Sequence, residues 1–211
     1  PEGALMKTWD KFLKDVLPKV SGCPEVLAEH AIKRAAQEFF DTTRVWRLWL
    51  PAITTADQIT DYALPLESRA ELVRLETATL DGCEINVLAA EDLPRDWKTY
   101  PDTMAPCVHT TDRKTIVLLP RPAADRTLLV EASMRPAEDA TGIEDDLFSL
   151  FVLPISHGAI AILKEDIGTS YADAGGAAYW RGQFNDAMVT HEFRRSQGYS
   201  SQRRPRRARF M

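Results

Sequence analysis

The hydrophobic period of this chain changes twice along its length, and this change most restricts the folds that it can adopt. Near both ends apolar residues recur at helical spacing, for example at Leu27, Ala31, Ala35 and Phe39. In between, residues 71–89 (ELVRLETATLDGCEINVLA) alternate as β-strands do. Helices followed by strands and then by helices predict an α+β fold.

Both helical regions carry start and stop signals. Residues 6–20 keep helical spacing up to Pro18, and Pro24 suits the first position of a second helix. Residues 174–197 show helical spacing too, with the apolar side expected at Ala177, Trp180, Phe184, Ala187 and His191.

The helix expected after residue 144 begins with acids, which complement the positive helix end. Pro154 is expected to kink or break it. Asp173 is expected to cap the last helix, and Gly198 to stop it.

The middle of the chain predicts antiparallel strands. Asp81-Gly82 between two alternating runs predicts a hairpin, whose first strand should carry Glu76 on one face and Leu75 on the other. Residues 111–122 and 126–136 predict a further strand pair. Residues 91–106 are rich in proline and lack periodicity, which predicts a long loop.

The predicted fold class is therefore a helical bundle formed by the N- and C-terminal helices, with an inserted antiparallel β section of about four to six strands. The expected single domain covers residues 1–201. Its helices lie at about 5–45 and 145–197, and its β section at about 46–135. Residues 202–211 are set apart as a basic docking tail.

Charge is divided unevenly between this tail and the rest of the chain. The whole chain has a net charge of −5, but residues 202–211 hold five arginines and no acid. The remainder then has 21 basic and 31 acidic residues, a net charge of −10. A body this acidic is unsuited to wrapping nucleic acid, which needs cations over the contact face.

The sequence offers few signals of catalysis or cofactor binding. The three cysteines are widely separated and no CxxC pair exists, which indicates reduced thiols rather than a disulfide framework or a zinc site. Phosphate-loop, dinucleotide-binding, esterase and metalloprotease motifs are missing. We expect no cofactor, no metal and no enzymatic activity.

Three groups of residues are candidates for chemical sites. Glu144, Asp145 and Asp146 could bind a metal, but a solvated helix start is the favoured interpretation. Cys107 and His109 could form a nucleophile pair in a small hydrolase, although no third group orients them. The histidines of the C-terminal third, His157 and His191, are expected to pack rather than to act as bases.

The membrane and secretion signals are also weak. The uncharged run 147–163 is shorter than a membrane span and contains Pro154 and Gly158. We expect a buried helix there, no signal peptide and no membrane partner.

The arginine-rich segment has three interpretations: a solvated end, a DNA-binding segment, or a strap that docks on a protein partner. Arginine suits docking because its planar fork pairs with carboxylates and carbonyls, and an aromatic residue can anchor the end in a pocket. The predicted docking residues are Arg203, Arg204, Arg206, Arg207, Arg209 and Phe210.

Several segments, taken in order, resemble the phage head–tail adaptor family, the connector or gateway proteins that include the podovirus tail tubular protein A type. They are TTADQITDYALP (54–65), VRLETATLDGCEINVL (73–88), the loop from Leu93 to Trp97, KTIVLLPRPAADRTLLVEASMRPAED (114–139), SHGAIAIL (156–163) and YADAGGAAYWRGQF (171–184). The resemblance spans about residues 5–197, and Asp57 departs from it where glycine is usual.

The resemblance implies a structural virion protein at the head–tail interface, assembled in the host cytoplasm. It implies a ring of twelve copies that joins the portal protein to a tail nozzle or tail tube protein. Genomic DNA would pass through the channel without specific binding. The alternative function is a nucleic-acid-binding module that uses the arginine-rich segment.

Overall fold

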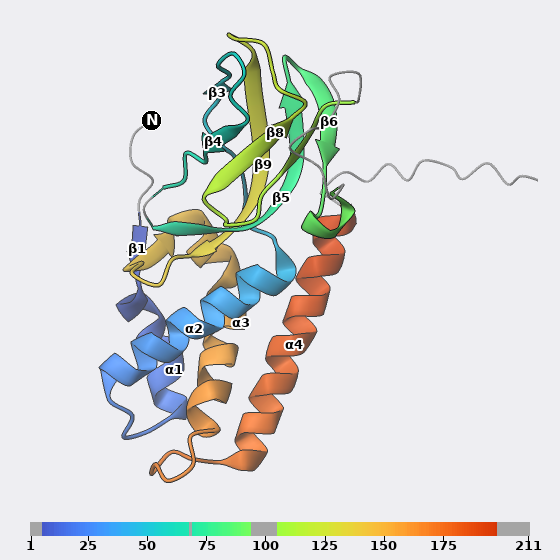
Figure 1. The fold of residues 1–211 in the computed structure, drawn as a ribbon. Coiled ribbons are helices and arrows are strands. Elements are labelled where there is room, and N and C mark those ends of the chain that lie inside the picture. Colours follow the sequence, from blue (N-terminus) through green and yellow to red (C-terminus); the bar gives the residue numbers. More distant parts are fainter. Residues whose placement is uncertain (1–5, 68, 94–104, 198–211) are drawn as a thin grey trace, which may run out of the picture.

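A curled sheet sits above a layer of helices (Figure 1). The computed structural model describes residues 6–67, 69–93 and 105–197. Within these ranges eight strands form the sheet, in the order β2-β9-β5-β6-β7-β8-β4, with β3 also paired to β9. The strands are β2 (Arg47–Trp49), β3 (Ile53–Thr54), β4 (Asp61–Ala63), β5 (Ala70–Leu80), β6 (Cys83–Val87), β7 (Cys107–His109), β8 (Thr115–Leu119) and β9 (Thr127–Pro136).

The helical layer is built around α3 (Asp145–Lys164) and α4 (Ala174–Gln197), which run antiparallel, with α2 (Glu25–Thr43) packed across them (Figure 1). Phe39 of α2 contacts Phe151 of α3, with ring centroids 5.2 Å apart, and Phe184 of α4 at 6.2 Å. Gly158 lets these helices approach, because a Cβ there would lie 2.9 Å from the Phe184 ring. Shorter elements complete the chain: η1 (Trp9–Phe12), α1 (Leu13–Val16), η2 (Leu17–Lys19) and η3 (Ala90–Asp92).

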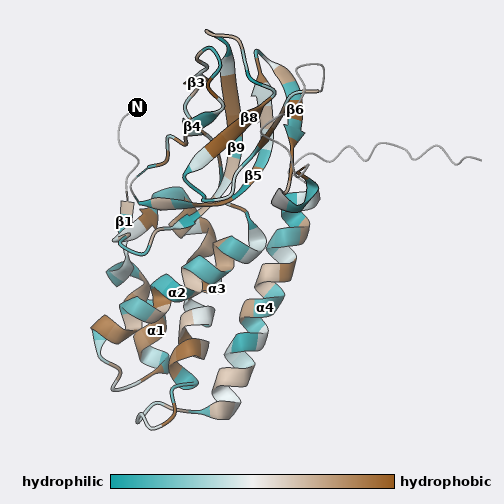
Figure 2. Cartoon of the chain, viewed as in Figure 1, coloured by the Kyte–Doolittle hydropathy of each residue, from teal (hydrophilic) through white to brown (hydrophobic). Residues whose placement is uncertain are grey.

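One buried apolar cluster continues from the helices into the sheet. Phe40 of α2 contacts Trp46, just before β2, with ring centroids 5.6 Å apart. Apolar residues also run along β8 and β9, as Figure 2 shows. The helices are therefore joined to the sheet by shared burial, which is the main stabilising contribution in a fold of this size.

The observed architecture corrects the predicted fold class. The prediction of a helical bundle with a small inserted section of four to six antiparallel strands is wrong: four α-helices, α1–α4, accompany a large, curled, eight-stranded sheet in the described part of the chain. The sheet is also mixed, because β6 and β7 are parallel. Four of its strands have only two or three residues, too few to show a period.

The order of the strands corrects a second prediction. Residues 111–122 and 126–136 do form strands, β8 and β9, but these do not pair with each other. Strand β9 pairs with β5 on one edge and with β2 and β3 on the other. Because both edges of β9 are occupied, β8 pairs with β4 and β7 instead.

The hairpin at Asp81-Gly82 is confirmed, and both residues have the positive φ (52° and 79°) that a tight hairpin turn requires. The predicted alternation of its first strand is wrong. Register shifts between Leu72 and Arg74, and again between Leu75 and Thr77, interrupt the pairing of β5 with β9. The bulges bring Leu75 into the core together with Leu72 and Ala78.

The N-terminal segment was expected to be helical from residue 6. Instead, β1 (Met6–Thr8) pairs with β10 (Gly142–Glu144) as a separate two-stranded sheet. Gly142 permits this pairing, because a Cβ at that position would clash with the backbone of Lys7. Strand β10 is also largely buried beside the start of α3. Pairing with a strand more than 130 residues later in the chain therefore decides the structure of residues 6–8, against their local helical spacing.

Pro154 was expected to kink or break α3. The helix continues through it, so the break is wrong, while the kink stays a prediction. Proline removes the N–H that would bond the carbonyl of Leu150, and Leu150 is exposed, so water can replace that bond. By length and composition α3 could also cross a membrane, but half of its most apolar window is buried inside the protein. It serves here as a core helix.

Candidate functional site

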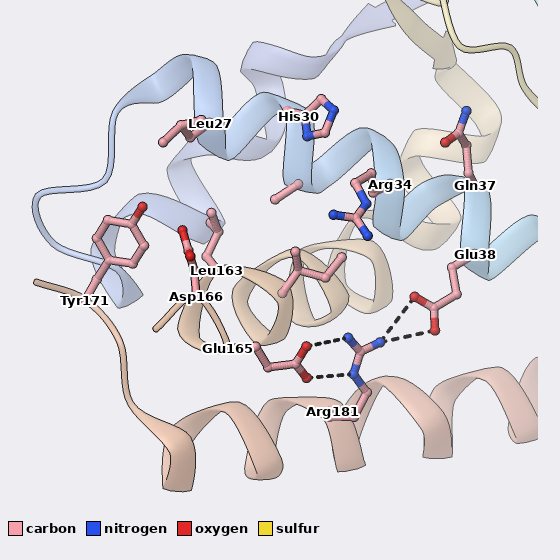
Figure 3. A pocket seen from close by; sticks show the side chains of 12 residues that line it. Leu27, His30, Arg34, Gln37, Glu38, Leu163, Glu165, Asp166, Tyr171 and Arg181 are labelled. Carbon is pink, nitrogen blue, oxygen red and sulfur yellow. Dashed lines mark hydrogen bonds and ion pairs between the residues drawn. The ribbon is translucent and has the colours of Figure 1, made fainter. Parts of the chain in front are cut away.

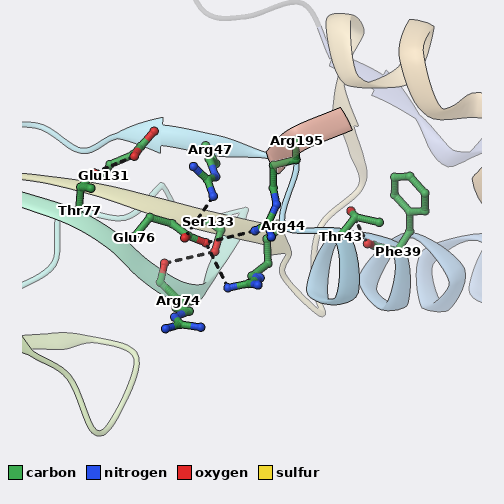
Figure 4. A network of polar contacts seen from close by, with 10 residues as sticks. All are labelled: Phe39, Thr43, Arg44, Arg47, Arg74, Glu76, Thr77, Glu131, Ser133 and Arg195. Carbon is green, nitrogen blue, oxygen red and sulfur yellow. Dashed lines mark hydrogen bonds and ion pairs between the residues drawn. The ribbon is translucent and has the colours of Figure 1, made fainter. Parts of the chain in front are cut away.

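A cluster of charges lies where the C-terminal ends of α2 and α4 meet the sheet (Figure 4). We call it the Glu76 cluster: the carboxylate of Glu76 on β5 and the guanidinium groups of Arg44, Arg47 and Arg195. Their Nη atoms lie 3.7, 3.2 and 3.9 Å from the Glu76 oxygens, in that order. All four side chains are partly or largely buried.

Local backbone features bring these side chains together. Glu76 is the extra residue where the register of β5 with β9 shifts between Leu75 and Thr77, which interrupts the strand's alternation there. Arg44 ends α2 in the left-handed conformation, with φ 51° and its N–H bonded to the Phe40 carbonyl. Glycine usually occupies such a position because a side chain is strained there. An arginine is nevertheless present, and its side chain points to Glu76 (Figure 4).

The bonding within the Glu76 cluster is incomplete. Among the described residues, only Arg47 donates a hydrogen bond to the carboxylate, at 3.2 Å. Nε and Nη1 of Arg195 and Oε1 of Glu76 are buried without a hydrogen-bond partner among the described residues. Burial, reinforced by the neighbouring charges of Arg44 and Arg47, lowers the pKa of Arg195 from its ordinary value. The site is thus short of negative charge.

A second cluster of charges joins the three long helices (Figure 3). We call it the Arg181 clasp: Arg181 of α4 lies between Glu38 of α2 and Glu165, the residue that follows α3. Its guanidinium donates to both carboxylates at 3.1 to 3.3 Å. Although burial opposes the charge, these bonds raise the pKa of Arg181 above its ordinary value.

The clasp borders a hollow of 590 Å³ between α2 and the end of α3. Leu27, His30 and Arg34 of α2 line one side, while Asp166 and Tyr171 line the other (Figure 3). Arg34 is exposed and forms no ion pair with another of the described residues. The hollow combines apolar and charged walls, as protein-contact surfaces do.

Large apolar side chains are exposed on the two C-terminal helices. Those on α4 recur at helical spacing along its outer side, and those on α3 are one turn apart. Their exposed fractions are 59% for Tyr179, 67% for Val189, 61% for Phe193, and 59% for both Leu150 and Leu153. Grouped exposure of this kind marks a surface for association.

The predicted nucleophile pair lies inside the sheet. Cys107 and His109 are both on β7, and each is only 1% exposed. Burial lowers the pKa of His109, and Asp61 opposes this shift weakly. A reacting pair needs a cleft that admits substrate, and these side chains occupy the packed interior instead.

The acidic residues at the start of α3 do not converge on a common point. Asp145 pairs with Lys7 at 3.5 Å, and Glu144 lies in β10 beside Met6. Burial, followed by the charges of Glu67 and Asp146, raises the pKa of Glu144. Across residues 6–67, 69–93 and 105–197, no group of three or more His, Cys, Asp or Glu side chains could hold a metal.

The two histidines of the C-terminal third pack as predicted. His157 contacts Trp180 with ring centroids 5.0 Å apart, and His191 contacts Phe151 at 5.1 Å. The predicted cap of α4 is also confirmed, since the Asp173 carboxylate accepts a hydrogen bond from the Gly176 N–H at 2.9 Å.

The predicted docking residues Arg203, Arg204, Arg206, Arg207, Arg209 and Phe210, as well as the predicted helix stop Gly198, lie outside the described residues. Sequence reasoning also missed the Glu76 cluster. Its members are separated by up to 151 positions in the chain, and a lone glutamate in an alternating strand carries no signal of its partners.

Comparison with known proteins gives one family. The family model described as SU10 adaptor protein matches residues 13–209, nearly the whole chain. No curated protein matches the chain.

Proposed function

The chain belongs to the SU10 adaptor protein family, a phage head–tail adaptor family, and from this we propose that it forms a ring that connects the portal to the tail. Membership implies a structural adaptor role at the head–tail junction of the virion, and a protein that is not an enzyme. The family match over residues 13–209 is the observation that carries the proposal.

In the proposed assembly, twelve copies encircle the path of the genome below the portal protein. The opposite face of the ring meets a tail nozzle or tail tube protein. Genomic DNA passes through without specific binding, and assembly takes place in the host cytoplasm.

Charge supports the channel part of the proposal. Outside residues 202–211 the chain has a net charge of −10. A wall of like charge repels phosphates, so that DNA slides past it instead of binding. The net charge is a property of the whole surface, and the proposal assigns part of it to the lining of the channel.

The helical layer supports the ring. A ring requires a heterologous contact, in which two different surfaces of one subunit meet their complements on two neighbours. The exposed apolar side chains of α4, with Val189 and Phe193 among them, offer one such surface. The hollow beside Leu27 and Arg34 offers a second surface of different composition.

Residues 202–211 are proposed to dock on the portal. The segment contains five arginines, Pro205 and Phe210, and little apolar bulk with which to fold alone. Arginine forks suit a polar groove on the portal, and Phe210 would anchor the end. We propose that the free subunit is a monomer or a labile oligomer, and that the ring closes on the portal.

The test is electron microscopy of the chain with and without its portal, together with a variant that lacks residues 202–211. We expect rings only on the portal, and loss of portal binding in the truncated chain. A chain that bound DNA in a salt-dependent manner, and lost this binding on truncation, would support the alternative of a nucleic-acid-binding module. A ring that forms without the portal would disprove the templating step alone.

A further inference from the structure

The Glu76 cluster holds more positive charge than its own residues neutralise. Three guanidinium groups surround one carboxylate, and Glu192, which acts on Arg195 through space, is exposed on α4. Even with Glu192 counted, the cations are in excess by one. Buried charges in proteins are normally paired, because an isolated charge loses its hydration.

The unused hydrogen-bond donors locate this excess. Nη1 of Arg195 lies 3.9 Å from Oε1 of Glu76, an ion-pair distance that is too long for a hydrogen bond. Its Nε is likewise buried without an acceptor in the part of the chain that the structure describes. These two donors lie on different edges of the guanidinium, because the Nε–H shares its edge with Nη2, so each needs an acceptor of its own. A charged carboxylate oxygen makes the stronger hydrogen bond to such a donor.

The backbone at Arg44 is a separate observation that points the same way. Arg44 has a φ of 51° at a helix end where glycine would be unstrained. Glycine there would remove one of the three cations. Strained positions persist where the side chain serves a purpose, and the only ion partner of Arg44 among the described residues is the already shared Glu76, at 3.7 Å.

We propose that the Glu76 cluster is a binding site for a second carboxylate, supplied by an acidic segment of a partner protein. The incoming carboxylate is held by Arg47 and Arg195, while Glu76 stays with Arg44. Arg47 is the most open of the three, with 34% of its side chain exposed, so it makes the first contact.

A carboxylate fits the site better than a nucleic-acid phosphate does. The site lies between two helix ends and a strand (Figure 4), and its side chains are 13 to 34% exposed. A duplex approaching it would face an acidic body, with the net charge of −10 outside the last ten residues. A single acidic side chain on a protein segment can approach the partly exposed Arg47 without that penalty.

The site goes beyond the proposed ring, and it can be tested without a portal. The probe is a short oligoglutamate peptide added to the full-length chain, with a short DNA duplex and inorganic phosphate as comparisons. The readout is the side-chain Nε–H resonance of Arg195, which reports on this site and not on residues 202–211.

Two variants should change the affinity in opposite directions. Arg47→Gln removes one contact and should weaken oligoglutamate binding about tenfold, the effect of one charged hydrogen bond. Glu76→Gln removes the competing internal carboxylate and should strengthen the binding. Arg34→Gln, the same change at an exposed arginine away from the cluster, should leave it unaltered.

A purely structural cluster would not produce this pattern, because both changes would then only destabilise the fold. Saturable movement of the Arg195 resonance, with opposite shifts in affinity for the two variants, supports the proposal. Absence of that movement, weaker binding in Glu76→Gln, or tighter binding of the duplex than of oligoglutamate would overturn it. Binding of phosphate alone would also overturn it, since the site would then be a general oxyanion site.

Discussion

Helix α4 is held to the rest of the molecule by two clusters of charge with opposite composition. In the Arg181 clasp one cation lies between the two anions Glu38 and Glu165. In the Glu76 cluster one anion lies among three cations. The first lies in the first half of the helix and the second at its C-terminal end (Figure 1).

The two clusters differ in the sign of their excess charge and also in how many of their hydrogen-bond donors have acceptors. Arg181 donates four hydrogen bonds to its two carboxylates, through Nε and both Nη atoms. Arg195 donates to no residue among those described. A cluster whose bonds are complete serves the fold, whereas one with unused buried donors has capacity left for a partner.

The largest change expected at α4 comes from removing its apolar anchor. Phe184 is fully buried against Phe39 and Gly158. Phe184→Ala should lower the free energy of unfolding by about 4 kcal/mol, since it leaves a cavity. Urea unfolding followed by circular dichroism measures this. Phe193→Ala, on the exposed side of the same helix, is the control. An equal loss of stability in both variants would show that the buried Phe184 is not the apolar anchor of α4.

Removing the single anion of the Glu76 cluster should have the next largest effect. Glu76→Gln leaves three arginines facing one another, and we expect a loss of about 2 kcal/mol, between the values for exposed and fully buried pairs. The loss should shrink as salt is added, because added anions screen the repulsion. Glu38→Gln, which leaves Arg181 with Glu165, is the matched change in the clasp and should cost less.

The clasp itself should contribute modestly. Its two carboxylates are roughly half exposed, at 43% and 50%, so water screens the ion pairs. Arg181→Gln should lower the free energy of unfolding by about 1 kcal/mol. If this change cost more than Glu76→Gln, the proposed contrast between a satisfied and an unsatisfied cluster would be wrong. Chemical denaturation of the two variants side by side decides this.

Protonation of the half-buried histidines His157 and His191 should produce the smallest effect. Burial lowers the pKa values of His157 and His191, with Arg194 adding to the effect at His191. In the unfolded chain the histidines have pKa values of about 6.5. Below that pH the unfolded chain therefore binds more protons than the folded chain does. Stability should therefore be fully present above that pH and decline as pH falls below it.

Unfolding at about pH 7.5 and about pH 5.5 tests this sign. His157→Phe keeps the contact with Trp180 and removes one titrating group, so its pH dependence should be flatter. A dependence as steep as that of the native chain would assign the effect to groups other than His157.

Much of the local structure could be predicted because neighbouring residues determine it. Asp81-Gly82 predicted a hairpin from two residues that tolerate positive φ. Asp173 predicted a helix cap, because its carboxylate can accept a hydrogen bond from the N–H three residues later. The packing of His191 followed from the spacing of apolar residues along one helix. In each case the interaction spans a few residues, so the sequence contains all of its parts.

The sheet could not be predicted in the same way. Strands such as β3 and β4, with two and three residues, are stabilised by neighbours from distant parts of the chain. The bulges that move Leu75 into the core depend on the register with β9. The Glu76 cluster depends on both, because it joins residues from α2, β2, β5 and α4.

By itself the sequence determined where the chain is helical in most of both terminal regions, where its main hairpin turns, and how unevenly its charge is spread. It also contained the pattern of the adaptor family, which the match over residues 13–209 bears out. Only the tertiary structure decided which strands are neighbours and which arginines share a carboxylate. Those contacts bring together groups tens of residues apart, and their energy depends on burial and distance, which exist only once the chain has folded.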